Sequence, residues 1–148
     1  MSCKNIFNNG TPSKWNIDII EIGAKWWYID SQGDPTGHAD QDDKRVNLGS
    51  GESDELKSPS GECTAATLSI FKVEASDGRT DILSKRNVAR PNECFTEVPL
   101  TLGPKEELVQ LSNIDSSKSI QDILKGIEYD DLIDLGIKND SLETSSNK

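Results

Sequence analysis

Hydrophobic and polar residues alternate over several stretches of the chain. Two stretches show the alternation best, namely Trp15, Ile17 and Ile19, and later Val98, Leu100 and Leu102. A strand with one buried face produces this period of two. The alternation predicts short β-strands, and the Gly- and Pro-rich stretches between them predict turns. We therefore expect an antiparallel β-sandwich over residues 15–104.

The clearest single strand is expected within residues 63–74, which are dense in Thr, Leu, Ile, Phe and Val. Asp77-Gly78 follows, a dipeptide typical of hairpin turns, so a return strand is expected over residues 80–84. The phase of the apolar residues changes near Gly23, which predicts a bulge in the first strand.

The period changes after residue 105. Apolar residues then follow the spacing of one helix face, at Ile120, Ile123, Leu124 and Ile127. This spacing predicts a short helix, and a second one is expected over residues 129–135, before Gly136. The tail either docks on the sandwich or is presented to a partner, including a second copy of the chain in a homo-oligomer.

These patterns give a mainly β fold class, an antiparallel β-sandwich with a short C-terminal helical segment. Residues 1–14 are expected to form an N-terminal arm before the sandwich domain of residues 15–104. Residues 105–140 form the helical tail, and residues 141–148 are expected to be disordered.

The aromatic run Trp26-Trp27-Tyr28 is the most informative feature of the predicted sheet. Successive residues of a strand point to opposite faces, so Trp26 and Tyr28 share one face and Trp27 has the other. We expect Trp26 to lie in the core and Trp27 to point outward. Trp and Tyr combine a large contact area with a polar group, which predicts a ligand face for a carbohydrate, a lipid headgroup or a protein.

An acidic segment, residues 31–43, follows this strand and is expected to be a loop. Asp30, Asp34, Asp40 and Asp42 offer the carboxylate oxygens that Ca²⁺ prefers, although their spacing does not match an EF-hand. The segment is therefore either a solvated acidic loop or a calcium site.

Composition narrows the class of protein. The chain has 148 residues, a formal net charge of -10 and a hydrophobic share of 33%, and its mean hydropathy is -0.60. This fits one domain with much solvated surface. The negative charge argues against nucleic acid as a partner, because binding to phosphates needs clustered Lys and Arg. The sequence shows no signal-peptide pattern and no apolar run of transmembrane length, so the chain is expected to be soluble, with its compartment open.

Three cysteines, Cys3, Cys63 and Cys94, match no zinc motif. Cys63 and Cys94 each precede a strand-like run. They form a disulfide if the chain meets an oxidising compartment, and are otherwise two free thiols.

Catalytic motifs are weak. His38 is the only histidine, and no Gly-x-Ser-x-Gly elbow or phosphate-binding glycine loop accompanies it. An enzyme is therefore the less favoured class. We expect a non-enzymatic recognition module that uses the aromatic strand and the acidic segment. The alternative is an acidic interaction or inhibitor protein that engages a basic partner through its negative surface and its amphipathic tail.

Overall fold

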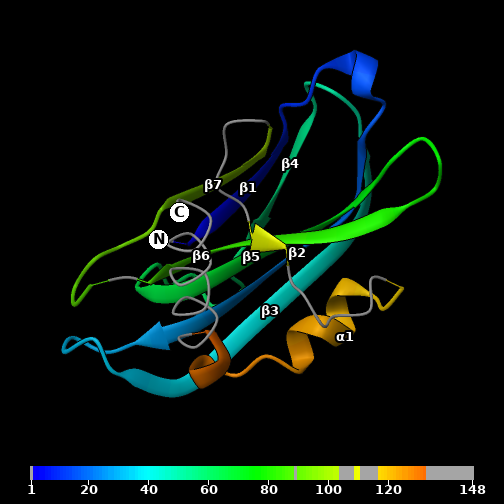
Figure 1. Cartoon of the computed structure of the whole chain (residues 1–148). Coiled ribbons are helices and arrows are strands. Elements are labelled where there is room, and N and C mark those ends of the chain that lie inside the picture. The colour runs from blue at the N-terminus through cyan, green and yellow to red at the C-terminus, as the bar shows by residue number, and fades with distance from the viewer. Residues whose placement is uncertain (1, 89, 104–108, 111–116, 133–148) are drawn as a thin grey trace, which may run out of the picture.

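Two β-sheets pack face to face in the computed structural model, which describes residues 2–88, 90–103, 109–110 and 117–132 (Figure 1). The smaller sheet has the strand order β4-β1-β7, and the larger has the order β3-β2-β5-β6-β8. The strands are β1 (Lys4–Asn9), β2 (Asp18–Ile29), β3 (Pro35–Leu48), β4 (Ser53–Lys57), β5 (Ala65–Glu74), β6 (Thr80–Val88), β7 (Glu97–Leu102) and β8 (Val109–Gln110). The expected β-sandwich with a short C-terminal helix is confirmed.

Strand β1 lies at the centre of the smaller sheet, antiparallel to β4 and parallel to β7. The N-terminal arm expected over residues 1–14 therefore contributes a central strand of the sandwich. Its inward positions are Asn5, Phe7 and Asn9, all buried. Because two of these three are polar, the strand did not show the expected alternation of apolar residues.

A buried polar network joins the two sheets at Asn5. Its Nδ2 donates to the hydroxyl oxygens of Thr67 at 2.9 Å and Ser69 at 2.8 Å, both on β5. Its Oδ1 accepts a hydrogen bond from Trp26 Nε1 at 2.9 Å. All four side chains are buried, so these bonds satisfy groups that water does not reach.

The first part of β2 differs from expectation. Residues Ser13–Trp15 form a short 3-10 helix, which ends at Asn16 in the left-handed conformation with φ of 52°. Trp15 is consequently 43% exposed and does not belong to a buried strand. The bulge was expected near Gly23. A register shift between Ile19 and Glu21 places it a few residues earlier in the strand.

Strand β3 replaces the loop that was expected over residues 31–43. It pairs with β2 over most of its length, and it forms the edge of the larger sheet. Most of its residues are exposed or half-buried, and only its last residue, Leu48, is fully buried. An edge strand without a buried face needs no apolar alternation, and its charges discourage pairing with other chains. The sequence pattern therefore resembled that of a loop.

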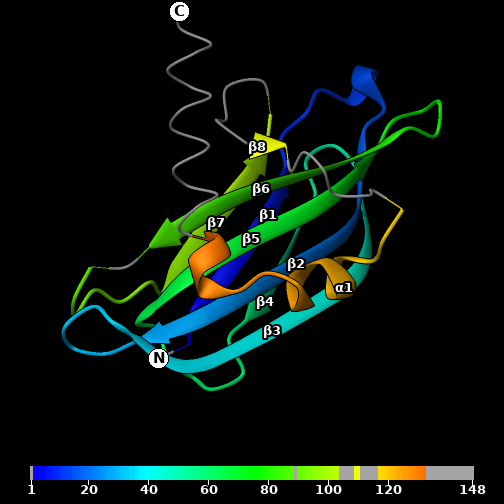
Figure 2. The ribbon, with the colours of Figure 1, turned by 60° about the horizontal axis from the view of Figure 1, so that its bottom comes forward.

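Helix α1 (Ile120–Lys125) lies over the outer face of the larger sheet and contacts β2, β3 and β5 (Figure 2). Ser119 caps its N-terminus by accepting a hydrogen bond from the backbone N–H of Asp122. Residues 129–132 are helical, as expected for the start of the second helix. The rest of that helix, and the C-terminus expected to be disordered, lie outside the described residues.

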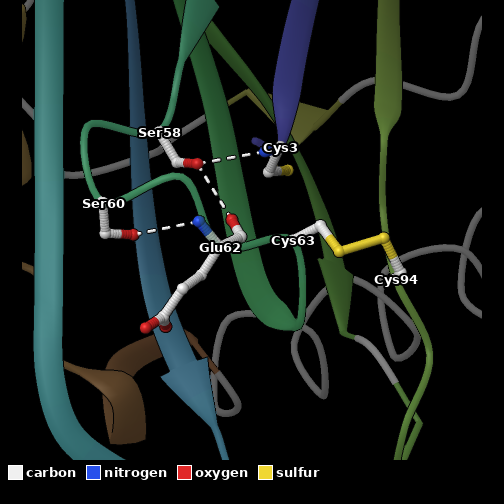
Figure 3. The surroundings of a disulfide bond; sticks show 6 residues. All are labelled: Cys3, Ser58, Ser60, Glu62, Cys63 and Cys94. Carbon is white, nitrogen blue, oxygen red and sulfur yellow. Dashed lines mark hydrogen bonds between the residues drawn. A yellow bond between two sulfur atoms is a disulfide. The ribbon is translucent and has the colours of Figure 1, made fainter. Parts of the chain in front are cut away.

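A disulfide joins Cys63 and Cys94, and thereby ties the start of β5 to the segment before β7 (Figure 3). Phe95 N donates a hydrogen bond to Cys63 O at 2.8 Å, which aligns the two segments beside the bond. Cys3 remains a buried thiol, and burial raises its pKa to about 11. Cys3 is therefore protonated and unreactive at neutral pH.

Removing this disulfide is expected to lower the stability of the fold. The bond closes a loop between positions separated by 31 residues, and the double variant Cys63→Ala/Cys94→Ala should lose about 2–4 kcal/mol of unfolding free energy. Urea unfolding measures this loss. Cys3→Ala is the matched control for removing a thiol without opening a loop, and an equal loss in both variants would contradict the prediction.

Candidate functional site

The aromatic strand is buried on both faces, which contradicts the exposed ligand face expected from the sequence. Trp26 is fully buried in the cluster between the sheets, together with Tyr28, which is 2% exposed. Trp27 belongs to a separate cluster on the other face of β2 and is only 5% exposed. The opposite orientation of the two tryptophans was predicted correctly, but Trp27 is covered and does not face solvent.

Trp27 is covered by residues 117–132, which we call the docked segment. Its buried apolar residues share one cluster with Trp27 and with the outer residues of β5 and β6. The members contributed by the docked segment are Ile120, Ile123, Leu124 and Leu132. The amphipathic spacing seen in the sequence thus serves docking on the same chain.

Two buried charged side chains of the sheet hold the start of the docked segment. Glu21 Oε2 accepts a hydrogen bond from Ile120 N at 3.0 Å, and Lys72 Nζ donates to Lys118 O at 2.6 Å. The two side chains also form an ion pair, with 3.7 Å between Lys72 Nζ and Glu21 Oε1. Each charge therefore has a partner of opposite sign and a main-chain hydrogen bond.

Lys25 holds the other end of helix α1. Its Nζ donates to Leu124 O, in the last turn of the helix, at 2.9 Å and to Ile127 O, just after the helix, at 2.8 Å. The same nitrogen lies 5.2 Å from the ring centroid of Trp27. Burial lowers the pKa of Lys25, and the carboxylate of Glu128 opposes this effect.

A pocket of about 140 Å³ opens beside Lys25, where β2 and β3 meet the docked segment. Rings line much of it, and two charged side chains contribute to its wall. These lining residues are Trp27, Tyr28, His38, Tyr129, Lys25 and Glu128. Aromatic walls with a few convergent polar groups are typical of sites for small ligands. Two consecutive strands and the docked segment, which is distant from them in sequence, therefore build this pocket.

Tyr28, His38 and Asp40 form a connected group at its edge. Tyr28 Oη donates a hydrogen bond to Asp40 Oδ2 at 2.7 Å, and the His38 ring stacks on Tyr28 with centroids 5.3 Å apart. His38 Nε2 lies 3.7 Å from the same Asp40 oxygen. Burial raises the pKa of Tyr28 to about 12, so the phenol remains a donor at neutral pH. The group orients His38, whose side chain is 63% exposed.

The structure does not gather the four aspartates expected as calcium ligands into one group. Asp30 Oδ1 accepts hydrogen bonds from the backbone of Gln32 and Asp34, and so stabilises the turn between β2 and β3. Asp40 and Asp42 lie further along, on β3. In the part of the chain that the structure describes, no group of three or more His, Cys, Asp or Glu residues could hold a metal ion.

A larger hollow, of about 600 Å³, lies at the opposite end of β2, beside the β5–β6 hairpin. Its apolar lining comes from Ile17, Val73 and Ala75. Of the charged lining residues, Arg79 lies in the turn before β6 and Asp81 lies at the start of β6. It has no aromatic lining residue, so we regard the smaller pocket as the better candidate.

Sequence reasoning missed Lys25 and Tyr129 as parts of the site. Lys25 is a charged residue within the apolar run of a buried strand, and this position was a usable signal. Tyr129 carried no such signal, because its position depends on how the docked segment crosses the sheet.

No family model, no curated protein and no solved structure matches the chain. Among the described residues, no helix has the length and apolar character needed to cross a membrane.

Proposed function

We propose that the protein is a non-enzymatic recognition module that binds a sugar residue in the pocket beside Lys25. The observation that carries the proposal is the combination of aromatic walls with Lys25 and Glu128 in a pocket of about 140 Å³. Rings contact the apolar face of a sugar, while an ammonium donates to its hydroxyls and a carboxylate accepts from them. Among the expected ligands, a lipid headgroup or a protein would make less use of so small a pocket.

His38 and Tyr129 are the residues through which the proposal can be tested. A glycan array probed with the full chain should identify ligands, and Tyr129→Ala and His38→Ala should each weaken binding at least about tenfold, the loss expected from one good contact. Trp15→Ala is the matched control, because Trp15 is exposed and lies outside the pocket. An array without ligands, or a ligand that tolerates Tyr129→Ala, would refute the proposal.

A second candidate is an acidic interaction protein that engages a basic partner. The observation in its favour is Asp43, whose pKa is raised by burial and by the neighbouring carboxylates Glu21, Asp42 and Asp122. These residues concentrate negative charge where β3 meets helix α1, and such a field attracts a basic surface.

The two candidates differ in their dependence on salt. Binding of polylysine, measured by titration, should weaken about tenfold or more between 50 and 500 mM NaCl if the acidic surface is the site. Asp43→Asn should also weaken the binding of polylysine relative to the wild-type chain. Sugar binding in the pocket should change little over this range, because neutral hydroxyls are not screened.

A further inference from the structure

Lys25 has little capacity left for a ligand in the pocket. Its Nζ already donates to the carbonyls of Leu124 and Ile127, and it lies 5.2 Å from the centroid of the Trp27 ring. An ammonium has three N–H donors, so at most one of them remains for a ligand. The residue is also buried. Lys25 therefore mainly supports the docked segment, and it offers a sugar one hydrogen bond at most.

The carboxylate of Glu128 is the charged group of the pocket that a ligand can use. Glu128 is an exposed residue of the docked segment and lines the pocket. Its backbone N–H donates to Asp131 Oδ2 at 2.8 Å, which stabilises the turn that carries it. Among the described residues, no group donates a hydrogen bond to its carboxylate. The carboxylate can therefore bind a ligand without losing a hydrogen bond within the chain.

Carboxylates outnumber ammonium groups around the pocket. Glu128 and Asp131 both act electrostatically on Lys25, and they oppose the larger effect of burial, which lowers its pKa. Asp40 lies at the edge of the pocket, 3.7 Å from His38 Nε2. Even a protonated His38 would offset only the carboxylate beside it, and Lys25 is the only lysine or arginine among the lining residues. The local field therefore favours a ligand with a positive charge.

The accessible rings of the pocket suit the same kind of ligand. His38 is exposed and Tyr129 is half-buried, whereas Trp27 and Tyr28 are almost fully buried. The face of an aromatic ring is negative, so it attracts an ammonium as well as the C–H groups of a sugar. Tyr129 and Glu128 are neighbours in the chain and both line the pocket, so one ligand group can contact both of them.

We propose that the sugar bound in this pocket is an amino sugar with a free, protonated amine that pairs with Glu128. This inference rests on the proposed function and names the class of sugar. The ammonium donates to the carboxylate and lies against the ring of Tyr129, while Lys25 contributes its remaining donor to a hydroxyl. A sugar acid would instead place its carboxylate beside that of Glu128, and an N-acetylated sugar has no charge for the field to attract.

Matched sets of sugars test the inference. Methyl glycosides of glucosamine, galactosamine and mannosamine are each compared with the N-acetyl form and with the parent hexose, in NMR titrations of the full chain at about pH 6, where the amine is protonated. In at least one set the amine form should bind about tenfold more tightly than both neutral forms, as expected for one hydrogen bond to a charged group. Neutral forms that bind as well as the amine forms would overturn the inference and leave the proposed function intact. No binding in any set would refute both.

Glu128→Gln separates the pocket from the overall charge of the chain. In this variant the affinity for the amine form should fall to that of the neutral forms. Glu97→Gln is the matched control, because it removes the same charge from an exposed residue of β7 outside the pocket and should keep the preference. A preference that survives Glu128→Gln, or that is lost equally in Glu97→Gln, would overturn the inference, since the amine would then respond to the net charge of -10. Tyr129→Ala should weaken the amine and neutral forms alike, so it reports on the proposed function and not on the preference.

Discussion

Trp26→Ala is expected to lower the free energy of unfolding by about 3–5 kcal/mol, the cost of removing a large buried ring. The side chain has no exposed surface, and it packs in the cluster between the sheets. Its removal would also leave Asn5 Oδ1 without the hydrogen bond from the indole. Denaturant unfolding followed by far-UV circular dichroism measures the change.

Trp15→Ala is the matched control for this measurement. Trp15 is 43% exposed, and the variant should change stability by no more than about 0.5 kcal/mol. If Trp26→Ala were as mild as Trp15→Ala, the inner cluster would not be packed around the indole as described.

Trp27 gives a different response, because it supports the docked segment. Trp27→Ala removes a ring from the cluster that also contains Ile120 and Leu124, so amides of helix α1 should exchange hydrogen faster than in the wild-type chain. Amides of β5 in the inner cluster should keep more of their protection. This contrast distinguishes loss of docking from loss of the sandwich.

Periodicity in the sequence was sufficient where one face of an element is apolar. Strand β7 and the β5–β6 hairpin with its turn at Gly78 follow the predicted pattern. Helix α1 begins and ends close to the expected positions, since Ser119 caps it and Gly126 follows it. In these elements the local sequence and the packing favour the same structure.

Periodicity failed where packing reverses the usual roles of residue types. Strand β1 turns Asn5 and Asn9 inward, because partners on other strands satisfy their amides. Strand β3 is an edge strand, so its acidic residues stay near solvent while its backbone pairs with β2. A local pattern contains no information about partners that are distant in sequence.

The candidate site was predicted only in part for the same reason. The sequence indicated that Trp26 and Trp27 face opposite ways, and the clusters show this. It did not indicate that the tail covers Trp27, and this contact decides whether the aromatic face is exposed. Glu128 and Tyr129 of the docked segment line the pocket beside Lys25 together with residues of β2 and β3, so the pocket also depends on this contact.

Asn5→Leu is expected to cost about 3–9 kcal/mol of unfolding free energy, because it leaves three buried hydroxyl and indole groups without partners at about 1–3 kcal/mol each. These groups are the hydroxyls of Thr67 and Ser69 and the indole N–H of Trp26. Leucine has the same number and branching of side-chain heavy atoms as asparagine and leaves no cavity, so the loss reports mainly the hydrogen bonds.

Asn8→Leu is the matched control, since Asn8 lies on the other face of β1 and is only half-buried. Its hydrogen bonds to Thr101 and Ser53 can be replaced by water, and about 1 kcal/mol or less is expected from its loss. The triple variant Asn5→Leu/Thr67→Val/Ser69→Ala should recover part of the stability lost in Asn5→Leu, because the two hydroxyls that lack a partner are then absent. If the triple variant were less stable than Asn5→Leu, the cost would come from packing and not from unsatisfied polar groups, and the network would not be what joins the two sheets at this point.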